Sequence, residues 1–258
     1  MARTIAVCNQ KGGVGKSTTA VNVGSYLALS GKRTLLIDLD PQGNATTSCG
    51  IQRERIEKDI YRVLVNGTPI SEAILKTQLE RLEIVPSHID LAAAEANLAT
   101  MPDRETVLKR AIETIRYAYD FLLLDCPPSL GLLTVNALVA SNSTMIPVQC
   151  EYLALEGLTS LLRSVTLIKQ QLNTELRIGG IVLTMTDFRA NLAREVSEDV
   201  KLFFKDLVFE TSIPRNIRLA ESPSFGKPIC LYDPNSTGAL AYRLLTQEVL
   251  AKEGEGGA

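Results

Sequence analysis

One octapeptide constrains the fold of this chain more than any other feature. Residues 11–18 read KGGVGKST, follow the apolar run 5–8 and precede a helix-like segment at 20–30. The three glycines permit backbone conformations that a side chain would forbid, so successive N–H groups can turn inward around an anion. The same anion would lie at the positive end of the following helix. A strand, a glycine-rich loop and a helix in this order indicate a phosphate-binding loop in an α/β fold.

The loop is a variant with two lysines. The usual pattern begins with a glycine at the position of Gln10, and here Lys11 stands beside that position. Lys16 can reach the β- and γ-phosphates of a nucleotide, and the Ser17 hydroxyl can ligate the Mg²⁺ that bridges them. Lys11 has no role in an ordinary loop of this kind. We assign nucleotide binding to the remainder of the loop, namely to Gly12, Gly13, Val14, Gly15, Lys16, Ser17 and Thr18.

Short runs rich in Val, Ile and Leu recur along the chain, as is typical of fully buried parallel strands. They occupy residues 4–8, 34–39, 82–86, 121–125, 144–148, 178–185 and 208–213. Helix-length segments with apolar residues three or four apart lie between or after them, at 102–117, 155–171, 191–204 and 238–251. This alternation predicts an α/β fold, a single P-loop NTPase domain whose mostly parallel sheet carries helices on both faces.

The chain has 258 residues and no linker rich in Pro, Gly or Ser, which predicts one domain over 1–252 and a flexible tail over 253–258. No apolar stretch approaches the roughly 20 residues that cross a bilayer, and the N-terminus enters the first strand without a signal peptide. We therefore expect a cytoplasmic protein with no membrane partner. The net charge is −2, so any binding to nucleic acid requires a local basic patch. The five cysteines include no CxxC pair and are expected to be reduced thiols.

Carboxylates follow two of the strand-like runs. Asp125 ends the apolar run 121–124, as a Walker B aspartate does when it supports Mg²⁺ coordination. Asp38 and Asp40 follow the second run, two residues apart on one strand face. One of them is expected to orient or activate the attacking water and the other to support the phosphate loop from behind, and spacing alone does not say which. The only histidine, His88, follows a different strand and does not compete for this role.

Four ordered motifs resemble one known family. They are KGGVGKST at 11–18, DLDPQGN at 38–44, LLLDCPPS at 122–129 and IPRNIRLAESPSFGKPI at 213–229, and together they resemble the ParA/Soj branch of the deviant Walker A ATPases. The resemblance covers nearly the whole chain. It implies hydrolysis of ATP with Mg²⁺ in a homodimer that encloses two nucleotides. It also implies that Lys11 acts on the partner's phosphates and that Asp40 positions water, while Lys16 and Asp125 complete the catalytic set.

The resemblance further implies a biological role. ATP-bound dimers of this family bind double-stranded DNA without sequence preference, and a ParB/Spo0J-type centromere-binding partner stimulates their slow hydrolysis during chromosome or plasmid segregation. A nucleoid-associated location follows. Positions that match DNA-contacting residues are Arg189 and Arg218, with Arg215 and Lys227 as weaker additions. Pro214 and Asn216 match positions that frame the adenine, and Phe225 departs from the histidine of many relatives.

Other members of the superfamily share the first three motifs. A MinD-like membrane ATPase would need a terminal amphipathic helix with basic residues, but this chain ends KEGEGGA after an apolar stripe at 240–249. A nitrogenase-type iron protein would need a second cysteine suitably spaced from Cys126, and a bacterial tyrosine kinase would need a tyrosine-rich tail. A nucleotide-gated scaffold, whose output is reversible binding to DNA or protein, stays open beside the ATPase.

Overall fold

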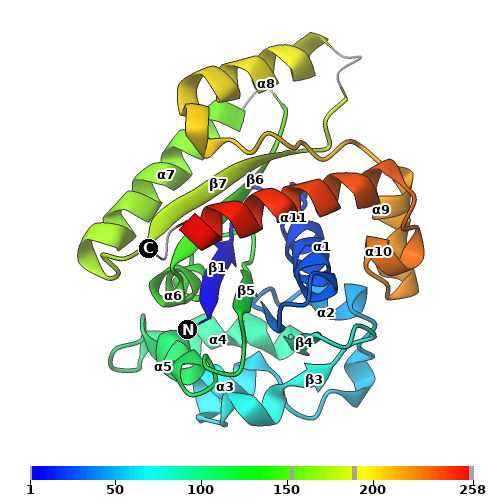
Figure 1. Ribbon diagram of the computed structural model, residues 1–258. Helices are drawn as coiled ribbons and strands as arrows, with labels where there is room; N and C mark the ends of the chain where they lie inside the picture. The colour runs from blue at the N-terminus through cyan, green and yellow to red at the C-terminus, as the bar shows by residue number, and fades with distance from the viewer. Residues whose placement is uncertain (1, 152–153, 188–190, 256–258) are drawn as a thin grey trace.

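A seven-stranded sheet with the order β3-β4-β2-β5-β1-β6-β7 forms the centre of the computed structural model, which describes residues 2–151, 154–187 and 191–255 (Figure 1). The strands are β1 (Arg3–Val7), β2 (Thr34–Asp38), β3 (Leu75–Lys76), β4 (Leu82–Val85), β5 (Phe121–Asp125), β6 (Ser143–Gln149) and β7 (Arg177–Thr184). All neighbouring strands pair in parallel except β3 and β4. The predicted α/β fold with a mostly parallel sheet is confirmed.

Helices cover both faces of this sheet (Figure 1). One face carries α1 and α11 with α2 and α10, and the other carries α3 to α7, with α8 packed on α7. The α-helices are α1 (Lys16–Leu29), α2 (Asn44–Ser48), α3 (Ile60–Asn66), α4 (Ala94–Ala99), α5 (Val107–Glu113), α6 (Leu132–Ala140), α7 (Ala154–Gln171), α8 (Asn191–Phe204), α9 (Ile217–Glu221), α10 (Ile229–Tyr232) and α11 (Thr237–Glu255). Short 3₁₀ helices are η1 (Arg53–Arg55), η2 (Ile70–Ala73), η3 (Ile89–Ala93), η4 (Lys205–Leu207) and η5 (Ser222–Phe225).

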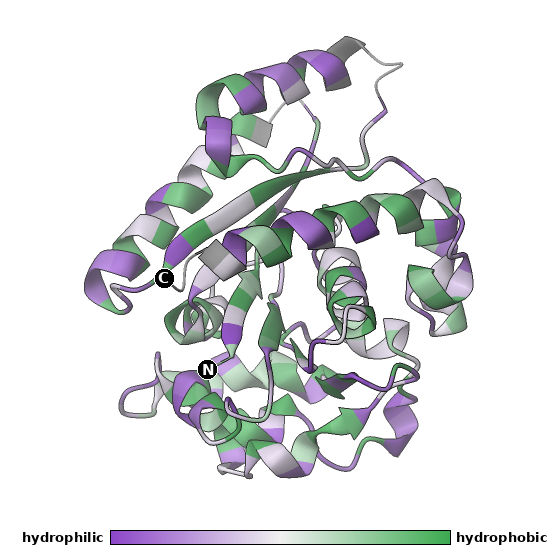
Figure 2. Ribbon diagram, viewed as in Figure 1, coloured by the Kyte–Doolittle hydropathy of each residue, from purple (hydrophilic) through white to green (hydrophobic). Residues whose placement is uncertain are grey.

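The central strands are buried on both sides, which explains why they read as continuous apolar runs. In β5, Leu122 and Leu124 belong to the core on one face, whereas Phe121 and Leu123 belong to the core on the other. A surface helix such as α8 needs only one apolar face, whereas α1 is buried on nearly all sides. Figure 2 shows this difference, because the central strands are mainly hydrophobic while α8 carries hydrophilic and hydrophobic residues in turn.

The phosphate loop and two acidic strand ends meet at one edge of the sheet. In the strand register Asp38 lies beside Asp125, and Asp125 lies beside Val7. The chain passes from β1 through α1 to β2 over one face of the sheet, and from β5 through α6 to β6 over the other. Such a change of direction leaves a crevice beyond the carboxyl ends of the central strands, where α/β folds bind ligands.

The run 208–213 is not a strand, contrary to the prediction. The N–H groups of Phe209 and Ile213 donate to β7 carbonyls at 2.9 and 2.8 Å. Between them, the N–H groups of Glu210 and Thr211 both donate to the Glu248 carboxylate at 2.9 Å. The segment therefore follows the edge of β7 without a continuous ladder. The antiparallel β3 at the opposite edge was not predicted, because two residues carry too little periodicity to be recognised.

Two helix boundaries also differ from the sequence analysis. Helix α5 begins at Val107, after turns in which Asp103 adopts a left-handed φ of 51°. Helix α11 continues through Glu255, so that residues 253–255, assigned above to a tail, are helical. The buried Glu253 accepts a hydrogen bond from Ser143 Oγ at 2.7 Å and pairs with Arg177, which ties this helical turn to the sheet. None of the described helices combines the length and apolar character that a bilayer crossing requires.

Candidate nucleotide-binding site

The loop 11–18 has the backbone geometry of an anion site. Gly13 and Gly15 adopt φ of 75° and 86°, in the left-handed region that favours glycine. Thr184 Oγ1 donates to the Val14 carbonyl at 2.9 Å, which attaches the loop to the end of β7. Gly15 is the N-cap of the 14-residue helix α1. The loop thus opens at the positive end of a long helix, where an anion is stabilised.

Lys16 lies folded over this loop. Its ammonium Nζ donates to the Lys11 carbonyl at 3.0 Å, and the residue is only 6% exposed. Burial lowers the pKa of Lys16, whereas the nearby Asp125 and Asp40 oppose that shift. A phosphate in the loop would bring further negative charge to the ammonium group and stabilise its charged form.

Asp125 is a buried carboxylate without a good hydrogen-bond partner. The residue has no exposed surface, and among the described residues neither carboxylate oxygen makes a hydrogen bond of good geometry, although the Ser17 hydroxyl lies close enough to interact with it. Burial raises the pKa of Asp125 well above its ordinary value, and the neighbouring charge of Asp38 raises it further, while the nearby Ser17 hydroxyl partly offsets the increase. A buried carboxyl group without a good partner is costly to retain, above all in its charged form, which indicates a binding role rather than a structural one.

Among the described residues, the hydrogen bonds to Asp38 come from α2 and from Asp40, and not from the phosphate loop that it was considered to support. Its Oδ2 accepts hydrogen bonds from Thr46 N–H at 2.8 Å and from Thr46 Oγ1 at 2.7 Å. Its Oδ1 accepts from Asp40 N–H at 3.1 Å. Burial raises the pKa of Asp38 to about 6 despite these hydrogen bonds. The effect of this arrangement is to fix the backbone that carries Asp40.

A cavity of about 330 Å³ opens over the loop. Its walls include Lys16, Ser17 and Asp40, which the sequence analysis assigned to phosphate, metal and water. Gln42 and Asn44 also line it and were not assigned. Their position shortly after the end of β2, as polar residues, is the sequence signal that could have identified Gln42 and Asn44 as site residues.

A second cavity of about 220 Å³ adjoins the first, and both are lined by Gly15, Thr18 and Met185. Pro214 and Asn216 lie in its wall, as do side chains from α9 and α11. Wall residues not assigned from the sequence include Thr184, Ile213, Leu219, Ala220 and Tyr242. Met185 has a φ of 52°, unusual for a residue other than glycine, at the border between the cavities. The pair of cavities has room for a polar phosphate chain and an adjoining, more apolar group.

The donor set between the two carboxyl strand ends suits Mg²⁺. This ion prefers oxygen ligands and is usually bound by one or two carboxylates together with waters and substrate phosphates. Asp125 offers a carboxylate with no competing partner, and Ser17 offers a hydroxyl beside it. Among the described residues no group of three or more His, Cys, Asp or Glu side chains could hold a metal. The residues therefore fit a cation that is completed by a bound nucleotide.

Lys11, the additional lysine of the loop, forms an ion pair with a carboxylate of the same chain. Lys11 Nζ pairs with Glu151 Oε2, and both side chains are 48% exposed. The other oxygen of Glu151 accepts a hydrogen bond from Gln149 Nε2. Lys11 therefore lies at the open edge of the site within its own chain.

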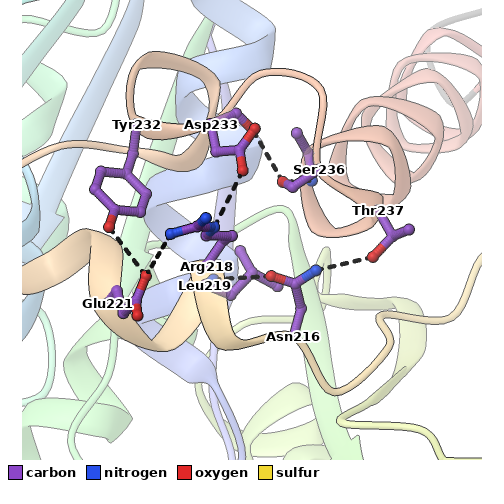
Figure 3. Close-up of polar contacts among 9 residues, drawn as sticks. Asn216, Arg218, Leu219, Glu221, Tyr232, Asp233, Ser236 and Thr237 are labelled. Carbon is purple, nitrogen blue, oxygen red and sulfur yellow. Dashed lines mark hydrogen bonds and ion pairs between the residues drawn. The ribbon is translucent and has the colours of Figure 1, made fainter.

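The positions predicted to contact DNA are only partly visible. Arg189 lies outside the described residues. Arg215, Arg218 and Lys227 are all exposed, on or beside α9 and η5. Arg218 is not a free cation, because its Nη1 lies 3.1 Å from Glu221 and its Nε 3.4 Å from Asp233 (Figure 3).

Proteins of known identity resemble this chain along nearly its whole length. A family profile described as an AAA domain (AAA_31) matches residues 2–178. The sporulation initiation inhibitor protein Soj of Bacillus subtilis is 54% identical over 251 residues, which cover 97% of this chain and 99% of that protein. The chromosome partitioning protein ParA of Myxococcus xanthus is 49% identical and covers 98% of this chain and 89% of that protein.

Solved structures share the architecture. Cobyrinic acid a,c-diamide synthase from Mycobacterium smegmatis, solved with bound ADP and magnesium, has a TM-score of 0.86 and 37% identity, covering 99% of this chain and 97% of that chain. The cell division ATPase MinD of Pyrococcus furiosus has a TM-score of 0.81 and 25% identity, covering 97% of this chain and 99% of that chain.

Proposed function

Because the chain belongs to the ParA/Soj family of chromosome-partitioning ATPases, we propose that it binds ATP across the two adjoining cavities and hydrolyses it to ADP and phosphate. One observation carries this proposal. The cavity over the glycine-rich loop is lined by Lys16, Ser17 and Asp40, of which Lys16 and Ser17 are neighbours of the buried Asp125, and an apolar cavity adjoins it. In this proposal the triphosphate would lie over the loop and the adenine in the apolar cavity, whose wall includes Pro214 and Asn216.

Hydrolysis would be an in-line attack of water on the γ-phosphate, helped mainly by positioning and electrostatics. Lys16, whose ammonium group lies over the loop, would neutralise phosphate charge, and Asp40 would orient the water. Mg²⁺, held by Ser17 and Asp125, would supply charge stabilisation to the phosphates. Lys11 would act on the phosphates of a second copy, for which it must first leave Glu151.

The cellular role follows from the same family. We expect the ATP-bound form to dimerise, to bind duplex DNA without sequence preference on the nucleoid, and to respond to a ParB/Spo0J-type partner. The relatives from Myxococcus xanthus and Caulobacter vibrioides are both chromosome partitioning proteins, which supports this role.

The test is an Asp40→Ala variant, which should retain nucleotide but lose hydrolysis. We expect it to form an ATP dimer that binds non-specific duplex DNA, whereas with ADP it should stay monomeric and bind DNA weakly. Asp90→Ala is the matched control, since Asp90 is 70% exposed and lies outside both cavities. Rapid hydrolysis by Asp40→Ala would remove Asp40 from the catalytic set. Binding to anionic lipid vesicles in place of DNA would favour a MinD-like function.

A further inference from the structure

Arg218 is enclosed by two carboxylates from different segments. Glu221 ends α9, and Asp233 directly follows α10; their oxygens lie 3.1 and 3.4 Å from the guanidinium (Figure 3). The Tyr232 hydroxyl donates to the same oxygen of Glu221 at 3.0 Å. Tyr232 is itself packed against Phe225 at a ring-centroid distance of 4.9 Å. The Glu221 carboxylate is thus held beside the arginine by a neighbour that is itself packed in place.

A DNA phosphate would compete with these carboxylates for the same donors. A guanidinium presents its N–H groups in one fixed fork that matches either a carboxylate or a phosphate. One cation between two anions also gives the cluster a net negative charge, which repels phosphate. The Arg218, Glu221 and Asp233 side chains are 55%, 41% and 32% exposed. Ion pairs at such exposure are weak, so this one can be displaced.

The helix that carries Arg218 also borders the apolar cavity. Leu219 and Ala220 of α9 line it, together with the N-cap residue Asn216. Asn216 accepts from Leu219 N–H at 3.2 Å and donates to Thr237 Oγ1 at 2.8 Å. A nucleotide in this cavity would therefore contact the same five-residue helix that carries Arg218.

We propose that Glu221 and Asp233 mask Arg218 in the nucleotide-free protein, and that filling the apolar cavity releases this arginine, through α9, to bind a DNA phosphate. The inference rests on the proposed function, because it describes how Glu221 and Asp233 would regulate the proposed contact between Arg218 and DNA. ADP would fill the same cavity, so unmasking alone should give only weak DNA binding, and the ATP-dependent dimer should add the rest of the affinity.

The experiment compares Glu221→Gln with the wild-type protein on a fluorescently labelled non-specific duplex, across a salt series, without nucleotide and with ATP. The amide oxygen of the introduced glutamine can still accept from Tyr232, so the local fold should persist, and equal unfolding temperatures check this. Without nucleotide we expect about two- to fivefold tighter binding, the scale of one exposed ion pair. The logarithmic salt slope should steepen by about 0.9, which corresponds to one additional phosphate contact. With ATP the two proteins should bind alike.

Two further variants make the result specific. Glu72→Gln frees Lys58 from a comparable exposed pair and changes the net charge equally, and it should not tighten binding. Adding Arg218→Ala to Glu221→Gln should abolish the gain. Unchanged nucleotide-free binding by Glu221→Gln, while the wild type binds DNA with ATP, would overturn the masking and leave the proposed function intact. The same gain with ATP as without it would overturn the release step. A wild type that binds no DNA with ATP would reject the proposed function and this inference together.

Discussion

Replacement of Asp125 by asparagine should stabilise the nucleotide-free protein while destroying its response to Mg²⁺. The wild-type carboxylate is fully buried, makes no hydrogen bond of good geometry within the described chain, and lies beside Asp38. Asparagine has the same shape but no charge to desolvate, and its amide group can donate toward the Asp38 carboxylate. The substitution therefore removes a cost of folding and a charge repulsion at once.

The expected size follows from the cost of an unsatisfied buried polar group, about 1–3 kcal/mol. A chain of this size shifts its unfolding temperature by roughly 2–4 °C for each kcal/mol, so the variant should melt about 2–12 °C higher. The assay is thermal unfolding at pH 8 in EDTA, with Asp90→Asn as the exposed control. Since burial raises the pKa of Asp125, the wild type binds this proton more tightly when folded and loses stability as pH rises. The difference between variant and wild type should shrink at acidic pH.

With ATP and Mg²⁺ the order should reverse. A ligand at 100 times its dissociation constant stabilises by about 2.7 kcal/mol, and the wild type should gain this in a Mg²⁺-dependent way. The variant should gain little from Mg²⁺, because its amide cannot replace the carboxylate in metal coordination. A variant that is less stable than the wild type in EDTA would refute the reasoning, since it would mean that the Asp125 carboxylate is satisfied in the folded protein.

Three other substitutions test separate parts of the structure. Because the pKa of Asp38 is raised to about 6, the folded protein keeps the Asp38 proton to higher pH than the unfolded chain does. The free energy of unfolding should therefore fall by on the order of 3 kcal/mol between about pH 4 and 6. Asp38→Asn should lack this fall in denaturant unfolding measured across pH, and a profile identical to that of the wild type would contradict the raised pKa of Asp38. Lys11→Ala should reduce ATP-dependent dimerisation and hydrolysis, measured by light scattering and phosphate release, but leave nucleotide binding to the monomer intact; a collapse of monomer affinity would show that Lys11 acts within its own chain. Gly180→Ala would place a Cβ against the Phe209 ring, well inside van der Waals contact, and should lower the free energy of unfolding by about 1–3 kcal/mol in a denaturant titration. Gly157→Ala is the control, because its Cβ would meet open space and should not destabilise the protein.

The sequence was most informative where the chemistry is local. The left-handed backbone of Gly13 and Gly15 needs no distant partner to be foreseen, because glycine alone adopts it without strain. The fully apolar runs predicted buried strands for the same reason, and β5 (Phe121–Asp125) begins and ends where its run does. The carboxylates at the ends of β2 and β5 were likewise recognised as candidate site residues, and the structure brings them together because parallel strands share one carboxyl edge.

Local patterns were least informative at the edges of the sheet and between distant segments. The run 208–213 has the composition of a strand, but the Glu248 carboxylate from α11 takes two of its N–H groups. Asp38 and Asp40 could not be distinguished by spacing, and the hydrogen bonds from Thr46 decided that Asp38 supports α2. Tyr242 enters the apolar cavity from a helix far along the chain, where no motif marks it.

The sequence by itself determined the kind of fold, the phosphate loop and the family, because these depend on residue types at fixed short spacings that set backbone conformation and strand burial. Only the tertiary structure decided which charges are satisfied. It leaves Asp125 without a good hydrogen-bond partner among the described residues and gives Lys11 an acidic partner 140 residues away in the chain. Electrostatic energy depends on distance and burial in three dimensions, and neither can be read from the order of the residues.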